Sequence, residues 1–266
     1  MFLPLLRCTS ILFFLDIEAV LANTLEIRDT AYYPVNISQQ EACETAKINA
    51  QKQAMSKAGL EKGRFADLEI CTDDEAGATC SLIQESQSYY EGGYITSTDI
   101  IRQNIENIGY ERQCVIHAKI KVERFKGTPD PNFALSAELS KKKLIANETF
   151  FLIGETSKKA YIYLLGYLPQ TDELYTIIPN RFETVTLSDG EFVLPSKNSR
   201  AKYALEALIP KNYEDDQVSE VLLLLATIDE FSLLNKESAP NFYRRLNELG
   251  RDRWRKVHLG YTIFRE

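Results

Sequence analysis

Residues 160–180 read AYIYLLGYLPQTDELYTIIPN, two apolar, aromatic runs on either side of a polar turn. In an extended strand, successive side chains point to opposite faces. Tyr161 and Tyr163 then share one face, while Ile162 and Leu164 share the other, so both faces are apolar. A strand that is apolar on both faces is typical of the buried centre of a β domain. The stretch therefore predicts a central β-hairpin, in preference to an aromatic groove that binds a ligand.

The rest of the second half of the chain is also rich in β-type sequence. Residues 188–190, Ser-Asp-Gly, predict a hairpin-type turn, and an amphipathic helix is expected at 241–250, after Pro240. We expect a mainly-β, sandwich-like domain with one or two helices. Apolar runs predict its strands at residues 150–153, 160–167, 174–178, 182–187, 203–209, 221–228 and 257–264.

The first half of the chain predicts a helix that packs on an antiparallel sheet. Residues 25–31 alternate as a strand does, and a β-hairpin is expected from about 94 to 123. Ser38 is a typical N-cap residue, and Gly59 is a typical residue for the end of a helix. Small side chains on one helical face allow a close approach to a sheet. Between these two ends an alanine recurs at every fourth position: Ala42, Ala46, Ala50, Ala54 and Ala58.

The length and the distribution of residues favour two domains in an α+β fold. A chain of 266 residues has room for one large domain or for two of ordinary size. The segment GTPDPN at 127–132 is rich in structure breakers, and all five cysteines precede residue 115. We therefore expect an α+β domain at 23–126, a linker at 127–139 and the mainly-β domain at 140–266.

The first 22 residues have the pattern of a secretory signal peptide. One positive charge precedes the apolar run ILFFL at 11–15, and small residues precede a cleavage site after Ala22. Asp16 and Glu18 weaken the apolar region, and a buried N-terminal helix is the alternative. No later stretch approaches the roughly 20 apolar residues of a membrane span. The sequence predicts an exported protein without a transmembrane span.

Cysteine usage supports export. Without Cys8, which the signal peptide would remove, four cysteines remain, and an even number indicates disulfides with three alternative connectivities. Alternation in the last predicted strand of the hairpin places Cys114 on its apolar face, and Cys43 lies beside the alanine stripe that would cover this face. We expect a Cys43–Cys114 bond, with Cys71 and Cys80 closing an acidic loop. The chain-entropy model assigns roughly 4 and roughly 3 kcal/mol to these bonds.

The sequence contains no recognisable catalytic motif. Lys and Arg number 31 and Asp and Glu number 38, and the resulting charge of −7 disfavours a nucleic-acid partner. The phosphate-loop, GxGxxG, HExxH and GxSxG patterns are absent. Both histidines, His117 and His258, are expected to be structural, and the acidic cluster at 73–75 is expected to be solvated. We therefore expect no catalytic residue, no metal site and no cofactor.

The C-terminal tail differs in charge from the rest of the chain. Residues 241–266 contain seven Lys and Arg residues and three acidic residues, a net charge of +4, and they surround the only tryptophan. An aromatic residue with a charged rim is a common protein-binding surface. The alternative is a solvated helix whose tryptophan closes the core. The candidate interaction residues are Trp254, Arg244, Arg251, Arg253, Arg255 and Lys256.

Sequence patterns in both halves carry family resemblances. In the second half they are AYIYL (160–164), LYTIIPN (174–180), LSDG (187–190), LP (194–195) and the apolar strand at 221–227. With this spacing the second half resembles a bacterial domain of unknown function, the family numbered 4384. Through the helix at 41–59 and the segment 91–122, the first half is similar to the N-terminal domain of the flagellar assembly protein T family. The resemblances imply a bacterial envelope protein, periplasmic or outer-membrane-associated, and bring no catalytic residues.

The leading functional hypothesis is a non-enzymatic module for assembly or protein interaction in a bacterial periplasmic or surface machine. Its partners would be other envelope proteins, with association to peptidoglycan or the outer membrane. The first alternative is a carbohydrate- or peptidoglycan-binding module that uses exposed tyrosines. The second alternative is an unrecognised hydrolase built on scattered carboxylates.

Overall fold

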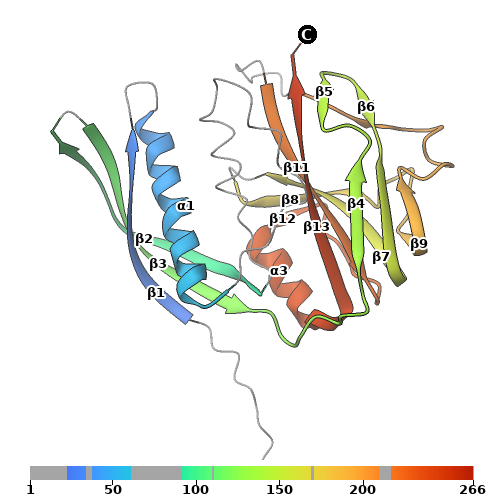
Figure 1. Ribbon diagram of the computed structural model, residues 1–266, viewed down its shortest axis with the longest axis horizontal. Helices are drawn as coiled ribbons and strands as arrows, with labels where there is room; N and C mark the ends of the chain where they lie inside the picture. The colour runs from blue at the N-terminus through green and yellow to red at the C-terminus, as the bar shows by residue number, and fades with distance from the viewer. Residues whose placement is uncertain are drawn as a thin grey trace, which may run out of the picture.

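The computed structural model describes residues 23–33, 38–60, 92–109, 111–168, 171–209 and 217–265. Over these residues the protein is mostly β and contains two α-helices, in keeping with an α+β or mainly-β class (Figure 1). The expected signal peptide at 1–22 lies outside the described residues, and so do Cys71 and Cys80. The roles expected for these residues stay predictions.

A three-stranded antiparallel sheet and one helix form the first part of the fold. The strand order is β1-β3-β2, and helix α1 covers one face of the sheet. The elements are β1 (Asn23–Tyr33), α1 (Gln39–Lys57), β2 (Gly93–Ile108) and β3 (Glu111–Arg124). The predicted strand, helix and hairpin are confirmed. Gly59, with a φ of +69°, follows the helix in the left-handed conformation that glycine favours.

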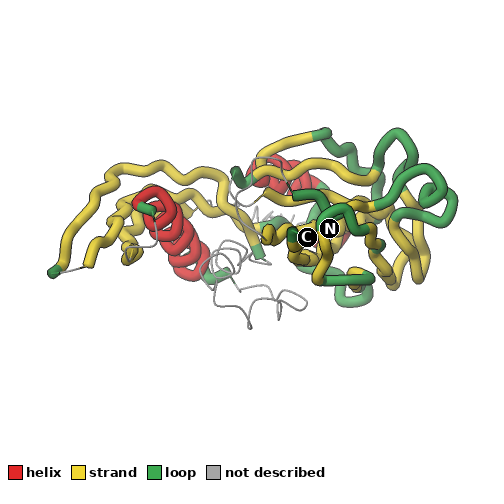
Figure 2. Tube along the Cα trace, turned by 90° about the horizontal axis from the view of Figure 1, so that it is seen from above, coloured by secondary structure: helices red, strands yellow, loops and turns green. Residues whose placement is uncertain are grey.

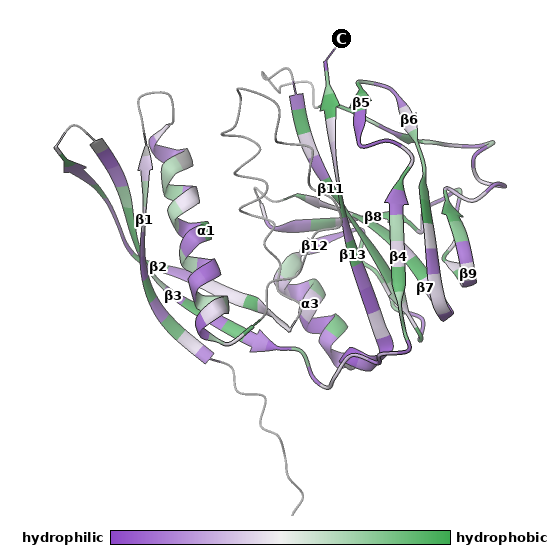
Figure 3. Ribbon diagram, viewed as in Figure 1, coloured by the Kyte–Doolittle hydropathy of each residue, from purple (hydrophilic) through white to green (hydrophobic). Residues whose placement is uncertain are grey.

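The alanine stripe is the face that α1 turns toward the sheet. Ala46, Ala50 and Ala54 are 0% exposed and share one core cluster with Ile116 and Ala118 of β3. Because alanine adds only a methyl group, the helix axis can approach the sheet closely. Figure 3 shows that hydrophilic residues occupy much of the rest of α1.

The predicted disulfide between the helix and the sheet is present. Cys43 of α1 is bonded to Cys114 of β3, and their Cα atoms are 5.1 Å apart. Both residues are buried. The bond ties α1 to the central strand of the small sheet across a sequence separation of 71 residues.

The rest of the described chain builds an eight-stranded sheet. The order β12-β8-β7-β11-β13-β5 forms its main path, and β4 and β9 also pair with β7. The long strand β7 pairs with β4 and β9 mainly through its first half, and with β8 and β11 through its second half. A separate pair, β6 with β10, and the helix α3 complete this part. The bounds are β4 (Leu135–Leu139), β5 (Lys143–Ile145), β6 (Thr149–Phe150), β7 (Leu152–Leu168), β8 (Glu173–Ile178), β9 (Thr186–Leu194), β10 (Leu205–Glu206), β11 (Gln217–Thr227), β12 (Lys236–Ser238), α3 (Ala239–Glu248) and β13 (Trp254–Phe264).

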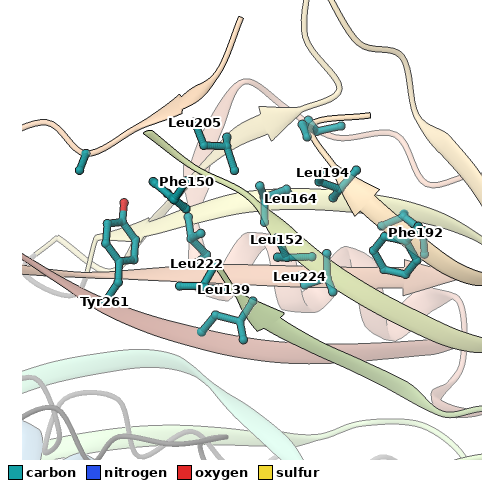
Figure 4. Packing of buried hydrophobic residues seen from close by; sticks show 14 of the residues in the cluster. Leu139, Phe150, Leu152, Leu164, Phe192, Leu194, Leu205, Leu222, Leu224 and Tyr261 are labelled. Carbon is teal, nitrogen blue, oxygen red and sulfur yellow. The ribbon is translucent and has the colours of Figure 1, made fainter. Parts of the chain in front are cut away.

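The large sheet has an apolar core on each of its faces. Ile162 and Leu164 of β7 belong to the cluster shown in Figure 4, to which β9, β11 and β13 also contribute side chains. Tyr163 and Leu165 belong to the cluster on the other face, which includes Phe242 of α3. The four β7 side chains are at most 1% exposed. The prediction of a hairpin strand buried on both faces is confirmed.

Four local expectations differ from the structure. Of the strand expected at 182–187, only the last two residues belong to a strand, β9. The expected linker at 127–139 contains β4, because the apolar residues at its end pair with β7 and join the core. The expected turn at 188–190 lies inside β9. There the pairing of β9 with β7 continues across a register shift between Thr156 and Ala160 of β7. Only Leu205–Glu206 of the expected strand at 203–209 pairs as a strand. The division into two domains stays a prediction.

Candidate functional site

Four aromatic rings from distant segments meet where the small sheet approaches the large one, and we call this cluster the aromatic joint. Its members are Tyr94 of β2, Phe125 after β3, Tyr243 of α3 and Trp254 of β13. The centroid of the Phe125 ring lies 4.9 Å from that of Trp254, 5.3 Å from that of Tyr94 and 6.0 Å from that of Tyr243. Aromatic pairs in such geometries contribute about 0.5–1.5 kcal/mol each beyond their burial. The joint therefore connects the two sheets through side-chain packing.

Hydrogen bonds to the backbone reinforce the joint. Asn247 in the last turn of α3 is buried, and its Oδ1 accepts a hydrogen bond from the N–H of Lys126 at 2.6 Å. The Nδ2 of Asn247 donates to the carbonyl of Arg124 at 3.3 Å. The N–H of Arg251 donates to the carbonyl of Lys126 at 2.8 Å. The chain that leaves β3 is thereby held against the C-terminal end of α3.

Trp254, expected at an interaction surface, is part of the core. Its side chain is 0% exposed and packs edge-on against Phe125. Arg251 is also buried, with its guanidinium carbon 4.0 Å from the centroid of the Trp254 ring. Lys256 Nζ lies 4.4 Å from the centroid of the Tyr243 ring. Trp254 is therefore corrected as an interaction candidate, and the alternative of a tryptophan that closes the core holds, because aromatic rings brought from other segments cover it.

The remaining basic candidates do not form one surface with the tryptophan. Arg253 pairs with Asp229 through two hydrogen bonds, and this pairing lowers the pKa of the Asp229 carboxyl. Arg255 donates a hydrogen bond to the carbonyl of Asp130. Arg244 is exposed on α3. The basic tail is thus used mainly for contacts within its own chain.

A carboxyl group and two tyrosines meet on one side of the large sheet, and we call this group the acid corner. It consists of Glu220 of β11, Tyr261 of β13 and Tyr175 of β8. The Tyr261 hydroxyl donates a hydrogen bond to Glu220 Oε2. Burial raises the pKa of the Glu220 carboxyl, and burial together with the charge of Glu220 raises the pKa of Tyr175 to about 12. A carboxyl group with a raised pKa can hold and deliver a proton, as a general acid does.

Gly166 of β7 makes room for the Tyr175 ring in the acid corner. The two residues are cross-strand partners, and a Cβ on Gly166 would lie 2.0 Å from the Cζ of Tyr175. The ring therefore lies directly over the glycine. Gly166 pairs with Leu222 on its other side, so the ring and Glu220 are on the same face of the sheet. The absence of a side chain at Gly166 allows the Tyr175 ring to approach Glu220.

Asn180, the last residue of the LYTIIPN stretch, is part of a polar loop network. The Oδ1 of Asn180 accepts hydrogen bonds from the N–H of Phe182 at 2.7 Å and from the N–H of Glu183 at 3.0 Å. The buried carboxylate of Glu183 accepts from the N–H of Ser196 at 2.8 Å and from the hydroxyl of Tyr203. The network joins the loop after β8 to the loop after β9, and we assign it a structural role.

The sequence gives little sign of the acid corner. Its one signal is Glu220, an acidic residue that directly precedes the apolar run at 221–226. The approach of Tyr175 and Tyr261 depends on the strand order β8-β7-β11-β13, which periodicity does not reveal. Strand order decides which side chains of a sheet meet.

The described part of the chain contains no group of three or more His, Cys, Asp or Glu residues that could hold a metal ion. In the same part, no helix is long and apolar enough to cross a membrane. Comparisons with protein-family models and with curated proteins find no match. The two family resemblances therefore depend on the sequence patterns alone.

Proposed function

We propose that the protein is an exported, non-enzymatic module for assembly or protein interaction in a bacterial envelope machine. In this proposal the parts at 23–126 and 140–266 are two domains, and the aromatic joint holds them in a fixed relation. The observation that carries the proposal is the use of the conspicuous tail residues, Trp254 and Arg251, inside this joint. A joint that fixes two domains relative to each other favours the role of an adaptor, because an adaptor presents two binding surfaces at a set distance.

Export is supported by the disulfide and by the N-terminal sequence. Structural disulfides persist in oxidising compartments such as the periplasm and are rare in the cytosol. The Cys43–Cys114 bond is consistent with that environment, and the resemblances favour a periplasmic or outer-membrane-associated location. Partners are expected among envelope proteins, with peptidoglycan or outer-membrane association.

Chemical cross-linking followed by recovery of the protein from envelope fractions tests this proposal. The expected result is recovery of the same envelope protein in repeated experiments, with loss of that cross-link when the aromatic joint is broken by a variant that stays folded. Recovery of cytosolic partners alone would overturn the proposal.

An acid–base enzyme is the second candidate, and the acid corner favours it. Perturbed carboxyl pKa values cluster at functional sites. The matched test compares the protein with the Glu220→Gln variant on a panel of chromogenic glycosides and esters. Turnover that disappears in the variant supports a hydrolase, and no turnover by the unmodified protein removes this candidate. The glycan-binding alternative has less support, because the tyrosines of the 160–180 hairpin are buried or half-buried.

A further inference from the structure

Along its middle, the outer edge of β2 pairs with no strand among the described residues. β2 is the last strand in the order β1-β3-β2, and no described strand pairs with its other side. Residues 99–103 are exposed, and they include Ile100 at 41% and Ile101 at 53%. Figure 2 shows the β2–β3 hairpin projecting from the end of the molecule opposite the large sheet. Unpaired edges with apolar side chains are templates for another strand.

A β-bulge in β2 sets which face its charged residues occupy. The register with β3 shifts between Ile100 and Arg102, so Ile101 is the extra residue. Asp99 lies opposite Lys119 of β3, and Arg102 lies opposite His117 of β3. Lys119 and His117 are two residues apart on one strand and share a face, so Asp99 and Arg102 share it as well. In a strand without the bulge, Asp99 and Arg102 would point to opposite faces.

This arrangement makes β2 complementary to itself. In an antiparallel pair whose two-fold axis passes between Ile100 and Ile101, Asp99 of each copy lies opposite Arg102 of the other. Directly opposed residues of an antiparallel pair share a face, and both residues here lie on the face away from α1. Two opposite-charge pairs form, and the exposed isoleucines of both copies meet at the axis.

The neighbouring pairs fit the same register. Thr98 and Gln103 both lie on the face that α1 covers, since they pair with residues of β3 on that face. Ser97 and Asn104 both lie on the opposite face. The second register shift, between Ile95 and Ser97, breaks this agreement, so the match covers residues 97–104.

We propose that the partner at this edge is a second copy of the chain, and that residues 97–104 of the two copies pair as antiparallel strands. The pairing joins two three-stranded sheets into one six-stranded sheet with two-fold symmetry, the commonest symmetry of homo-oligomers. This inference concerns self-association, and it stands whether or not the proposed envelope role holds.

Charge reversal tests the register. Sedimentation velocity on the purified protein is expected to show a dimer, and Asp99→Arg or Arg102→Asp alone is expected to weaken dimerisation on the order of tenfold or more, because like charges then face each other twice. The double variant Asp99→Arg/Arg102→Asp restores the opposite-charge pairs and is expected to recover the dimer. A monomeric unmodified protein, single variants that dimerise normally, or a double variant that stays monomeric would each overturn the inference.

A disulfide-trapping experiment tests the same register without relying on charge. An oxidised mixture of the Asp99→Cys and Arg102→Cys variants is expected to yield a covalent dimer linked between positions 99 and 102, at a higher level than either variant alone. Circular dichroism confirms that each variant is folded, which these exposed positions allow. Equal cross-linking of the single variants and the mixture would contradict the pairing.

Discussion

The N–H of Lys126, just after β3, donates a hydrogen bond to the side-chain oxygen of Asn247 in α3 at 2.6 Å. The two residues are 121 positions apart in the sequence. The Nδ2 of the Asn247 side chain in turn donates a hydrogen bond to the carbonyl of Arg124. The buried side chain of Asn247 thus joins the chain segment that follows β3 to helix α3, next to the aromatic joint.

Asn247→Ala should destabilise the protein by about 1–3 kcal/mol, because it removes both hydrogen bonds of a buried side chain, the one from Lys126 and the one to Arg124. Urea unfolding measures the loss. Asn241→Ala, at an exposed position of the same helix, is the control and should change the free energy of unfolding by less than about 0.5 kcal/mol. Equal effects of the two substitutions would contradict the role given to Asn247.

Trp254→Ala should cost about 3–5 kcal/mol, since it removes a fully buried ring from the aromatic joint. Trp254→Phe should cost less, because it keeps a ring against Phe125 and removes an indole N–H that has no hydrogen-bond partner among the described residues. Thermal and urea unfolding distinguish the two variants. A stable Trp254→Ala protein that fails only in partner capture would restore the surface role.

Replacing Cys43 and Cys114 together by alanine should lower the free energy of unfolding by about 4 kcal/mol, the chain-entropy value for a loop of this length. Peptide mapping under non-reducing conditions gives the connectivity directly. A peptide that links Cys43 to Cys71 or Cys80 would contradict the bond described for helix α1.

His258 should make stability fall as the pH drops below 6.5. Burial, followed by the nearby charge of Lys256, lowers the pKa of His258 well below the ordinary value of 6.5. Between the folded pKa and 6.5 the unfolded chain binds one proton more than the folded chain, so the free energy of unfolding falls by up to about 1.4 kcal/mol per pH unit of acidification. Urea unfolding from pH 7 to 5 is expected to show a steeper decline for the unmodified protein than for His258→Gln. Parallel curves would contradict this account.

Gly166→Ala should destabilise the protein by about 1–3 kcal/mol, because the new methyl group meets the Tyr175 ring. In a Tyr175→Ala background the same change should cost much less. A double-mutant cycle measured by urea unfolding gives the coupling between the two positions. Additive effects would show that the ring does not lie over the glycine.

Local patterns predicted the helix–sheet part of the fold well. Alanine spacing placed the buried face of α1, and alternation placed Cys114 on the face that α1 covers, so the disulfide followed from two local signals. The hairpin strand at 160–167 was predicted to be buried on both faces for the same reason, and it is. These features depend on residues close together in the sequence.

The joint and the acid corner depend on long-range contacts, and the sequence did not predict them. Trp254 lies among arginines in the sequence, and it is buried only because Phe125 and Tyr243 arrive from other elements. Glu220 meets Tyr261 through the pairing of β11 with β13. The segment that forms β4 was expected to be part of a linker. It is a strand because it pairs with β7, and residues 127–139 alone do not reveal that pairing.

The location and redox state of the protein in its own cells test the central proposal most directly. Free thiols are trapped by alkylation before lysis, the cells are fractionated, and Cys43 and Cys114 are examined by peptide mapping. We expect the protein in the envelope fraction, lacking residues 1–22 and with Cys43 bonded to Cys114. Recovery from the cytosol with an intact N-terminus and both cysteines alkylated would contradict the proposed role.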